Sequence, residues 1–176
     1  MSNSVLVRPA LNADIPAIAN IYEHYVRTHT STFEIDPPDA VEISARIERI
    51  QNAGLPYLVA EQDGLVLGYS YAGPYRTRAA YRHTVENSVY LQPDHVGRGL
   101  GALLLTAVID HCARTGYREM VAVIGDSQNQ ASIRLHTKLG FAHVGTLRYV
   151  GFKLNRWLDT VLMQKTLRSQ QAVVVE

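Results

Sequence analysis

The sequence is poor in cysteine. Cys112 is the only one among 176 residues, so no disulfide bond can form within the chain. Disulfide bonds are typical of secreted proteins, and their absence favours a reducing compartment such as the cytoplasm. The chain also lacks an apolar run of the roughly 20 residues that span a bilayer, and residues 1–4 show neither the basic region nor the apolar stretch of a signal peptide. We therefore expect a cytoplasmic protein without a membrane-spanning segment.

An excess of charge of one sign is missing as well. Seventeen Lys and Arg residues stand against sixteen Asp and Glu residues, which gives a formal net charge of +1. Nucleic acids and membrane surfaces bind basic footprints, so neither is expected as a partner. The seven histidines show no spacing typical of metal ligands, and we expect no metal ion.

What remains is the composition of an ordinary globular domain, with 47% hydrophobic and 19% charged residues. The length fits one domain, since single domains commonly have ~100–200 residues. The chain contains no internal repeat, low-complexity segment or linker.

Strand and helix patterns alternate along the chain. Alternating or continuous apolar runs predict strands at residues 5–8, 57–61, 65–71, 85–91, 120–124, 144–150 and 158–164. Apolar residues at helical spacing predict helices at residues 12–26, 39–53, 101–115 and 129–139. This mixture predicts an α/β or α+β domain around a single sheet.

Local signals mark several element ends. Asn12 is expected to cap the first helix, Asp39 and Glu42 form a capping pair for the second, and Gly140 closes the fourth. Asp63-Gly64 is a strong hairpin signal. The continuous apolar run at residues 120–124 is typical of a strand buried on both faces.

The segment most informative about function is a strand followed by a glycine-rich loop and a helix, at residues 89–101. The backbone amides at a helix N-terminus carry partial positive charge and bind phosphate, and Gly97, Gly99 and Gly101 let the backbone approach a ligand closely. By itself such a pattern is more often only a tight turn before a helix. The spacing matches neither a Rossmann dinucleotide site nor a triphosphate-binding loop with Gly-Lys-Ser/Thr.

A series of short motifs surrounds this loop. They are Phe33-Glu34, Thr-Val-Glu-Asn-Ser-Val-Tyr at residues 84–90, Gly-Arg-Gly-Leu-Gly at 97–101, Val-Ala-Val-Ile at 121–124, Asn129 followed by Ala-Ser-Ile at 131–133 and Leu-His at 135–136, Leu-Gly-Phe at 139–141, and Gly-Phe-Lys…Arg-Trp-Leu-Asp at 151–159. In order and spacing, over nearly the whole chain, the sequence resembles the GNAT acetyltransferase superfamily, in its phosphinothricin/methionine sulfoximine acetyltransferase branch.

The resemblance implies the GNAT fold, an α+β arrangement with a central mixed, mostly antiparallel sheet that is flanked by helices and splays between its fourth and fifth strands. It implies one domain over residues 1–168, followed by a flexible tail at 169–176. Acetyl-coenzyme A is the expected cosubstrate, bound in the splayed opening, and a homodimer is the expected assembly.

The resemblance also implies the residues that hold acetyl-coenzyme A. They are Val89, Tyr90, Leu91, Gly97, Arg98, Gly99, Leu100, Gly101 and Asn129. Asn129 is equally a favoured helix cap, and Tyr90 is equally suited to core packing. Val96 departs from the superfamily pattern, which has Gln or Arg there. The loss of that side chain should weaken phosphate binding, and Arg98 is a candidate to compensate.

Two residues are candidates for proton transfer. A carboxylate such as Glu86 can take the proton of the attacking amine, although a strand Glu is normally only a solvent-facing residue. His136 stands where many superfamily members have a tyrosine that protonates the leaving thiolate. An imidazole can do so near neutral pH, but a helical histidine is more often simply packed.

The acceptor site is assigned by the resemblance to Phe33, Glu34, Arg76, Thr77, Arg78, Asn87 and Ser88. Guanidinium groups suit recognition of a carboxylate or phosphinate, and a solvated basic loop is the plainer alternative. The expected reaction is acetylation of the α-amine of phosphinothricin, methionine sulfoximine or methionine sulfone. Acetylation of protein N-termini or lysines, and coenzyme A binding without catalysis, are the alternatives.

Overall fold

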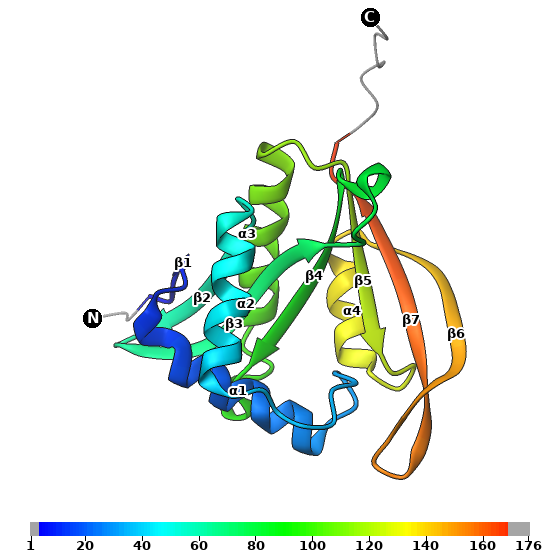
Figure 1. Ribbon diagram of the computed structural model, residues 1–176, viewed down its shortest axis with the longest axis horizontal. Coiled ribbons are helices and arrows are strands. Elements are labelled where there is room, and N and C mark those ends of the chain that lie inside the picture. The colour runs from blue at the N-terminus through cyan, green and yellow to red at the C-terminus, as the bar shows by residue number, and fades with distance from the viewer. Residues whose placement is uncertain (1–3, 169–176) are drawn as a thin grey trace, which may run out of the picture.

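A seven-stranded sheet organises residues 4–168, the part of the chain that the computed structural model describes (Figure 1). The spatial order is β1-β2-β3-β4-β5-β7-β6. The strands are β1 Leu6–Pro9, β2 Tyr57–Gln62, β3 Leu65–Pro74, β4 Thr84–Leu91, β5 Glu119–Gly125, β6 Ala142–Lys153 and β7 Arg156–Thr166. All neighbours are antiparallel except β4 and β5. The expected mixed, mostly antiparallel sheet is therefore confirmed. The predicted tail at residues 169–176 lies outside the described residues.

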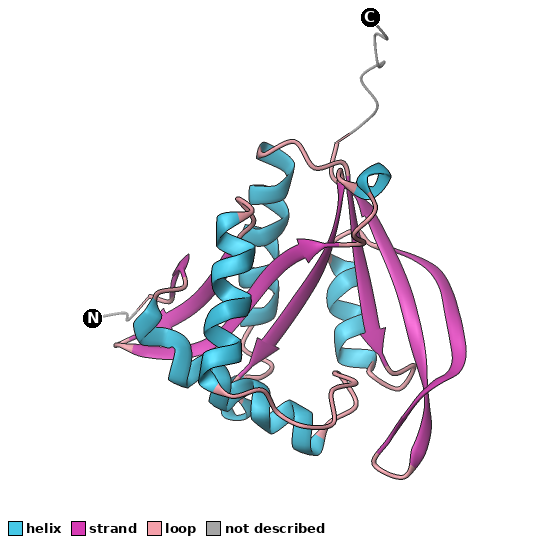
Figure 2. Cartoon of the chain, in the orientation of Figure 1, coloured by secondary structure: helices cyan, strands magenta, loops and turns pink. Residues whose placement is uncertain are grey.

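The helices cover both faces of the sheet (Figure 2). They are α1 Ile15–Thr28, α2 Ala40–Asn52, α3 Leu100–Arg114 and α4 Gln130–Lys138. Apolar residues of α1 and α2 pack with β2 and β3 in one buried cluster, and those of α3 pack with β4 and β5 in another. Side chains alternate between the faces of a strand, so Tyr69 belongs to the first cluster and Ala72 to the second.

Several local predictions are confirmed at atomic detail. The side chain of Asp39 accepts a hydrogen bond of 2.8 Å from the backbone N–H of Glu42 and so caps α2. Asp63 and Gly64 both have positive φ angles, 54° and 80°, as a two-residue hairpin turn with right-handed strand twist requires. Gly140 follows α4 with φ +87°.

The predicted cap of the first helix is wrong. Asn12 begins a short 3-10 turn, and Asp14 occupies the N-cap position of α1. The carboxylate of Asp14 accepts hydrogen bonds from the Arg8 guanidinium, at 2.7 and 2.9 Å, and from the backbone N–H of Leu11. These contacts with β1 and the turn fix where the helix begins.

The prediction that residues 120–124 are buried on both faces is also wrong. Met120, Ala122 and Ile124 are buried, but Val123 is 39% exposed. The face of β5 that carries Val123 meets the opening between β4 and β5 rather than a helix. Within residues 4–168, no helix is both long and apolar enough to cross a membrane.

Candidate active site

The sheet opens between β4 and β5. These parallel strands pair only in their first halves, as far as Asn87 and Ala122. Beyond that point β4 continues to Leu91 beside β3, whereas β5 continues to Gly125 beside β7. Each strand keeps its outer neighbour and loses its inner one. The backbone of residues 88–91 therefore has no strand partner on one side and can pair with an extended ligand.

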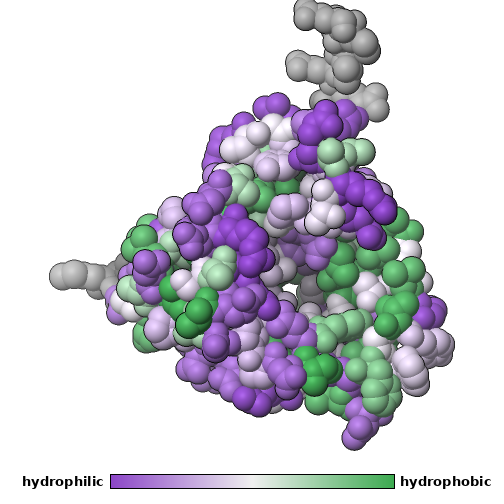
Figure 3. Space-filling view, viewed as in Figure 1, coloured by the Kyte–Doolittle hydropathy of each residue, from purple (hydrophilic) through white to green (hydrophobic). Residues whose placement is uncertain are grey.

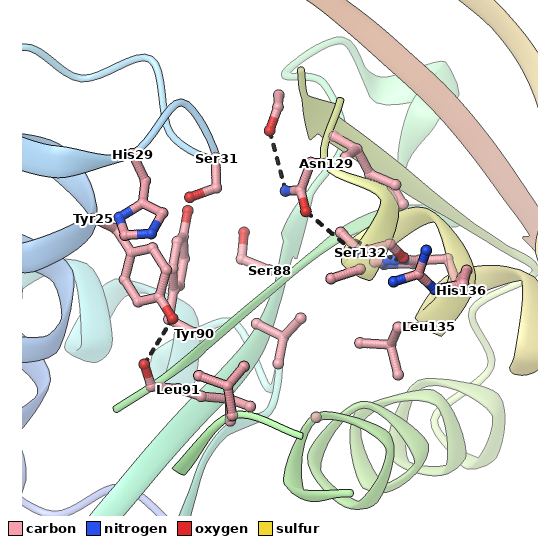
Figure 4. A pocket seen from close by; sticks show the side chains of 18 of the residues that line it. Tyr25, His29, Ser31, Ser88, Tyr90, Leu91, Asn129, Ser132, Leu135 and His136 are labelled. Carbon is pink, nitrogen blue, oxygen red and sulfur yellow. Dashed lines mark hydrogen bonds between the residues drawn. The ribbon is translucent and has the colours of Figure 1, made fainter. Parts of the chain in front are cut away.

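A cavity of about 850 Å³ fills this opening. Its walls come from β4, β5, α3 and α4, with α1 and the loop after it opposite α4 (Figure 4). Of the residues expected to bind acetyl-coenzyme A, those that line the cavity are Val89, Tyr90, Leu91, Gly97, Gly99, Gly101 and Asn129. Leu100 and Arg98 do not line it, because the side chain of Leu100 is buried and that of Arg98 is turned to solvent.

The glycine-rich loop brings the start of α3 to the cavity. Gly97 and Gly99 both have φ +81°, which disfavours any residue with a side chain, and Gly99 is the N-cap residue of α3. A Cβ atom at either position would meet nothing within 4 Å. The glycines are therefore required by backbone conformation, and the space above them is open to a ligand. A helix N-terminus beside open space is suited to an anion such as a pyrophosphate.

Charged side chains contribute little to this loop. Val96 is 55% exposed and lines the cavity without offering a hydrogen bond. The Arg98 guanidinium donates a hydrogen bond to Nδ1 of His95 at 2.6 Å, so it is engaged within the loop itself. The backbone amides at the start of α3 are therefore the groups of this loop that are best placed to bind an anion.

Asn129 joins α4 to β5 at the cavity wall. Its side-chain oxygen accepts a hydrogen bond of 3.2 Å from the backbone N–H of Ser132, and its amide nitrogen donates to the carbonyl of Gly125 at 3.2 Å. The capping role expected from the sequence is confirmed. The same residue lines the cavity, so capping and ligand contact are compatible in space.

His136 is buried at the point where the strands part, with 3% of its surface exposed. Its Nδ1 lies 2.8 Å from the carbonyl oxygen of Ser132, and its Nε2 lies 3.0 Å from Oδ1 of Asn87. The amide nitrogen of Asn87 donates to the carbonyl of Val121 at 3.2 Å, which turns Oδ1 toward the ring. Both ring nitrogens therefore face acceptors.

Two opposing effects act on the proton of His136. Burial lowers its pKa below the ordinary value of 6.5, because a charged ring is poorly solvated there, while the hydrogen bond to Ser132 raises it. Burial is the larger effect. A second proton on the ring would satisfy both acceptors, so the protonation of His136 is coupled to the orientation of Asn87.

Glu86 lies just before the parting point, opposite Gly73 of β3, and does not line the cavity. Side chains alternate along a strand, so Glu86, Ser88 and Tyr90 point to the same face. Tyr90 packs against Tyr22 of α1 with ring centroids 5.1 Å apart, which identifies that face as the one covered by α1. Burial raises the pKa of Glu86 and outweighs the lowering effect of the Arg76 guanidinium. A raised pKa suits a general base near neutral pH.

The other residues expected in the acceptor site are divided between the two faces of β4 and two loops. Ser88 and Asn87 line the cavity. Arg76, Thr77 and Arg78 lie in the exposed loop after β3, outside the cavity.

Phe33 and Glu34 follow α1 and also lie outside the cavity. The ring of Phe33 is seated against Gly125 and Gly151, where a Cβ atom at either glycine would collide with it. Glu34 pairs with Arg46 of α2 at 2.6 Å. Phe33 thus connects the loop after α1 to β5 and β6.

One wall of the cavity was not predicted. It is formed by His24, Tyr25, His29, Thr30 and Ser31 of α1 and the following loop. The hydroxyl of Tyr25 donates to the carbonyl of Leu91 at 2.8 Å, which fixes α1 against the end of β4 (Figure 4). These residues are far from β4 in the chain, since 66 positions separate Tyr25 from Leu91, and no local sequence pattern indicates their role.

Within the described part of the chain, no group of three or more His, Cys, Asp or Glu residues is placed to hold a metal ion.

Comparison with known proteins agrees with this geometry. Residues 18–141 match the model of the acetyltransferase (GNAT) family. The chain is 50% identical to phosphinothricin N-acetyltransferase of Alcaligenes faecalis, over 97% of this chain and 86% of that protein. It is 43% identical to L-methionine sulfoximine/L-methionine sulfone acetyltransferase of Salmonella typhimurium, over 94% of this chain and 96% of that protein.

A solved structure is similar throughout. The GNAT superfamily phosphinothricin acetyltransferase of Sinorhizobium meliloti, crystallised in complex with acetyl-coenzyme A, superposes with a TM-score of 0.89 and 41% identity, over 92% of this chain and 88% of that one.

Proposed function

The chain belongs to the acetyltransferase (GNAT) family and is an acetyl-coenzyme A-dependent N-acetyltransferase, and we propose that it performs the transfer in the cavity between β4 and β5. Its acceptors are amino acids of the phosphinothricin, methionine sulfoximine and methionine sulfone type. The observation that carries the proposal is the loss of pairing beyond Asn87 and Ala122, because it leaves strand backbone and a glycine-capped helix N-terminus around one cavity.

In this cavity the pyrophosphate and the pantetheine arm of acetyl-coenzyme A are held by different elements of the fold. The amides at the start of α3 hold the pyrophosphate, and the unpaired backbone of residues 88–91 holds the pantetheine arm as an added strand. Asn129 contacts that arm from the opposite wall. The thioester then lies near Ser88 and Val89, two to three residues beyond Glu86 along β4.

Glu86 accepts the proton of the acceptor amine, directly or through a water molecule, because its raised pKa favours the transfer near neutral pH. The freed amine attacks the acetyl carbonyl carbon, and the backbone N–H near Val89 stabilises the negative charge that forms on the carbonyl oxygen. The C–S bond breaks, the nitrogen gives up its second proton, and His136 or a water molecule passes a proton to the thiolate. Arg76 and Arg78 face the carboxylate of the acceptor from the loop after β3.

The test is turnover of acetyl-coenzyme A with a panel of acceptors: the three amino acids above, other free amino acids, and peptides with free N-termini or lysines. Release of one thiol for each acetylated amino acid supports the proposal. Faster acetylation of peptides would replace it with a protein acetyltransferase, and tight coenzyme A binding without turnover on any acceptor would replace it with a sensor.

The assembly is a homodimer that forms through β6 and β7. Exposed apolar side chains gather on this side of the molecule (Figure 3). They are Val144, Leu147, Tyr149, Val150, Phe152 and Trp157, each at least half exposed. An apolar surface of this kind is typical of an interface. Light scattering after size-exclusion chromatography tests the homodimer, and a monomer at micromolar concentration would contradict it.

The enzyme acts in the cytoplasm, which its unpaired, buried Cys112 supports.

A further inference from the structure

The hydroxyl of Ser31 stands out among the polar groups of residues 4–168. Its Oγ is the one buried side-chain nitrogen or oxygen atom in this range without a hydrogen-bond partner. A buried hydroxyl without a partner is destabilising, so such groups are rare in native proteins, and a hydrogen bond to a bound ligand is one way to satisfy them.

The segment that carries Ser31 is held firmly on both sides. Before it, the hydroxyl of Thr30 donates to Asp126 at 2.7 Å, and Arg156 also pairs with Asp126, at 2.9 Å. After it, the side chain of Thr32 bonds the hydroxyl of Tyr22 at 2.8 Å.

The backbone of the segment is fixed as well. The buried ammonium group of Lys153 donates to the carbonyl of Thr32 at 2.7 Å. The hydroxyls of Thr30 and Thr32, on either side of Ser31, therefore both have hydrogen-bond partners. The Ser31 hydroxyl between them has none, although its backbone is held between these two anchored neighbours.

Ser31 lines the cavity on the wall opposite α4. In Figure 4 it lies at the end of the loop after His29, across the opening from Asn129, with Ser88 of β4 between them. The glycine-rich loop lines the same cavity but leads into α3, which covers the other face of the sheet from α1. Serine has three staggered rotamers, so a rotation about its Cα–Cβ bond directs the hydroxyl to a ligand without moving the loop.

We infer that Ser31 is an acceptor-binding residue whose hydroxyl accepts a hydrogen bond from the amine of the amino-acid substrate. The inference rests on the proposed function. An amine that has lost a proton to Glu86 and points its lone pair at the acetyl carbon retains two N–H bonds, and an acceptor atom such as Ser31 Oγ fixes their direction.

The test is Ser31→Ala, measured for both stability and kinetics with methionine sulfoximine as acceptor. Since the hydroxyl has no partner in the free enzyme, its removal should leave the unfolding midpoint in urea unchanged or raise it. The kcat/KM for the acceptor should fall about three- to tenfold, the value of one hydrogen bond, while the KM for acetyl-coenzyme A stays the same. Ser31→Thr, which keeps the hydroxyl, should restore most of the activity.

Thr32→Val is the matched contrast, because it removes a neighbouring hydroxyl that is hydrogen-bonded, and it should lower the unfolding midpoint. A rise in the KM for acetyl-coenzyme A alone in Ser31→Ala would reassign the hydroxyl to the cosubstrate. Loss of stability in Ser31→Ala, or unchanged kinetics, would overturn the inference. A wild-type enzyme that acetylates no free amino acid would instead overturn the proposed function.

Discussion

His136 and Asn87 face each other where the sheet opens, with Nε2 of the ring 3.0 Å from Oδ1 of the amide. Asn87 also bonds the carbonyl of Val121, and His136 that of Ser132. One hydrogen-bonded chain therefore runs from β5 through β4 to α4 at the last pair of the parallel ladder. It fixes how far the strands stay together and where the cavity begins.

The buried state of His136 predicts a pH dependence of stability. Its pKa is lowered in the folded protein, so below about pH 6.5 the unfolded chain binds a proton that the folded chain does not. The folded state therefore keeps its full stability above that pH, where His136 is neutral in both states, and loses stability as the pH falls. We expect His136→Gln to flatten the decrease in unfolding free energy between pH 7 and 5, measured by urea titration. His143→Gln, at an exposed position, should keep the wild-type slope, and equal slopes in all three proteins would contradict the assignment.

Glu86 predicts a pH dependence of catalysis. A general base must be deprotonated, so turnover should fall as the pH drops through its raised pKa, above the ordinary 4.5. Glu86→Gln should lower kcat by ~10²–10⁴-fold and remove this acid limb, with little change in acetyl-coenzyme A binding. Glu48→Gln, on the exposed side of α2, is the control. A loss below about threefold would leave Glu86 with at most an orienting role.

Gly99 and Gly116 provide a matched pair for the phosphate site. Both have positive φ angles, +81° and +96°, and a Cβ atom at either would meet nothing within 4 Å, but only Gly99 lines the cavity. Valine at either position should lower stability through backbone strain. Only Gly99→Val should also raise the KM for acetyl-coenzyme A strongly, because its side chain occupies space above the start of α3. Steady-state kinetics with the two variants decide this, and an equal change in KM would remove the loop from the binding site.

Arg76 predicts selectivity for the acceptor carboxylate. Its guanidinium is fully exposed and lies over the ring of Tyr75, with Cζ 5.1 Å from the ring centroid. Because exposed charges are screened, Arg76→Ala should raise the KM for methionine sulfoximine only about three- to tenfold. The KM for the corresponding amine without a carboxylate should not change. Arg82→Ala, in the same loop, is the control. If both acceptors lose affinity equally, the carboxylate is recognised elsewhere.

Val96 predicts a gain in affinity. It lines the cavity at the glycine-rich loop with 55% of its surface exposed, and it stands where the superfamily has Gln or Arg. Val96→Arg should lower the KM for acetyl-coenzyme A by about two- to fivefold, less at high salt, as expected for an exposed charge pair. Val41→Arg, on the exposed face of α2, controls for the added charge. An unchanged KM would mean that backbone amides alone bind the phosphates.

Features that depend on neighbouring residues were predictable from the sequence. The Asp39 cap, the Asp63-Gly64 turn and the Gly140 end of α4 each need only contacts within about four residues. The glycine-rich loop and Asn129 were predictable for the same reason, since a helix N-terminus is specified by the few residues around it. Motif order then indicated the family and the sheet, although not which side chains reach the cavity.

Tertiary structure decided the rest. The carboxylate of Asp14 is taken by Arg8 and the turn, so the first helix does not begin at Asn12. Val123 is exposed because β4 and β5 separate beside it, an event that no pattern within β5 records.

The wall around Ser31 depends on contacts between residues far apart in the chain, 96 positions for Thr30 and Asp126 and 121 for Lys153 and Thr32. Short-range signals set the elements by themselves, since capping and turn geometry act within one helical turn. Which residues line the cavity was decided only by the tertiary structure, because side chains become buried only once distant segments have packed together. The lowered pKa of His136 and the unpartnered Ser31 hydroxyl both result from that burial.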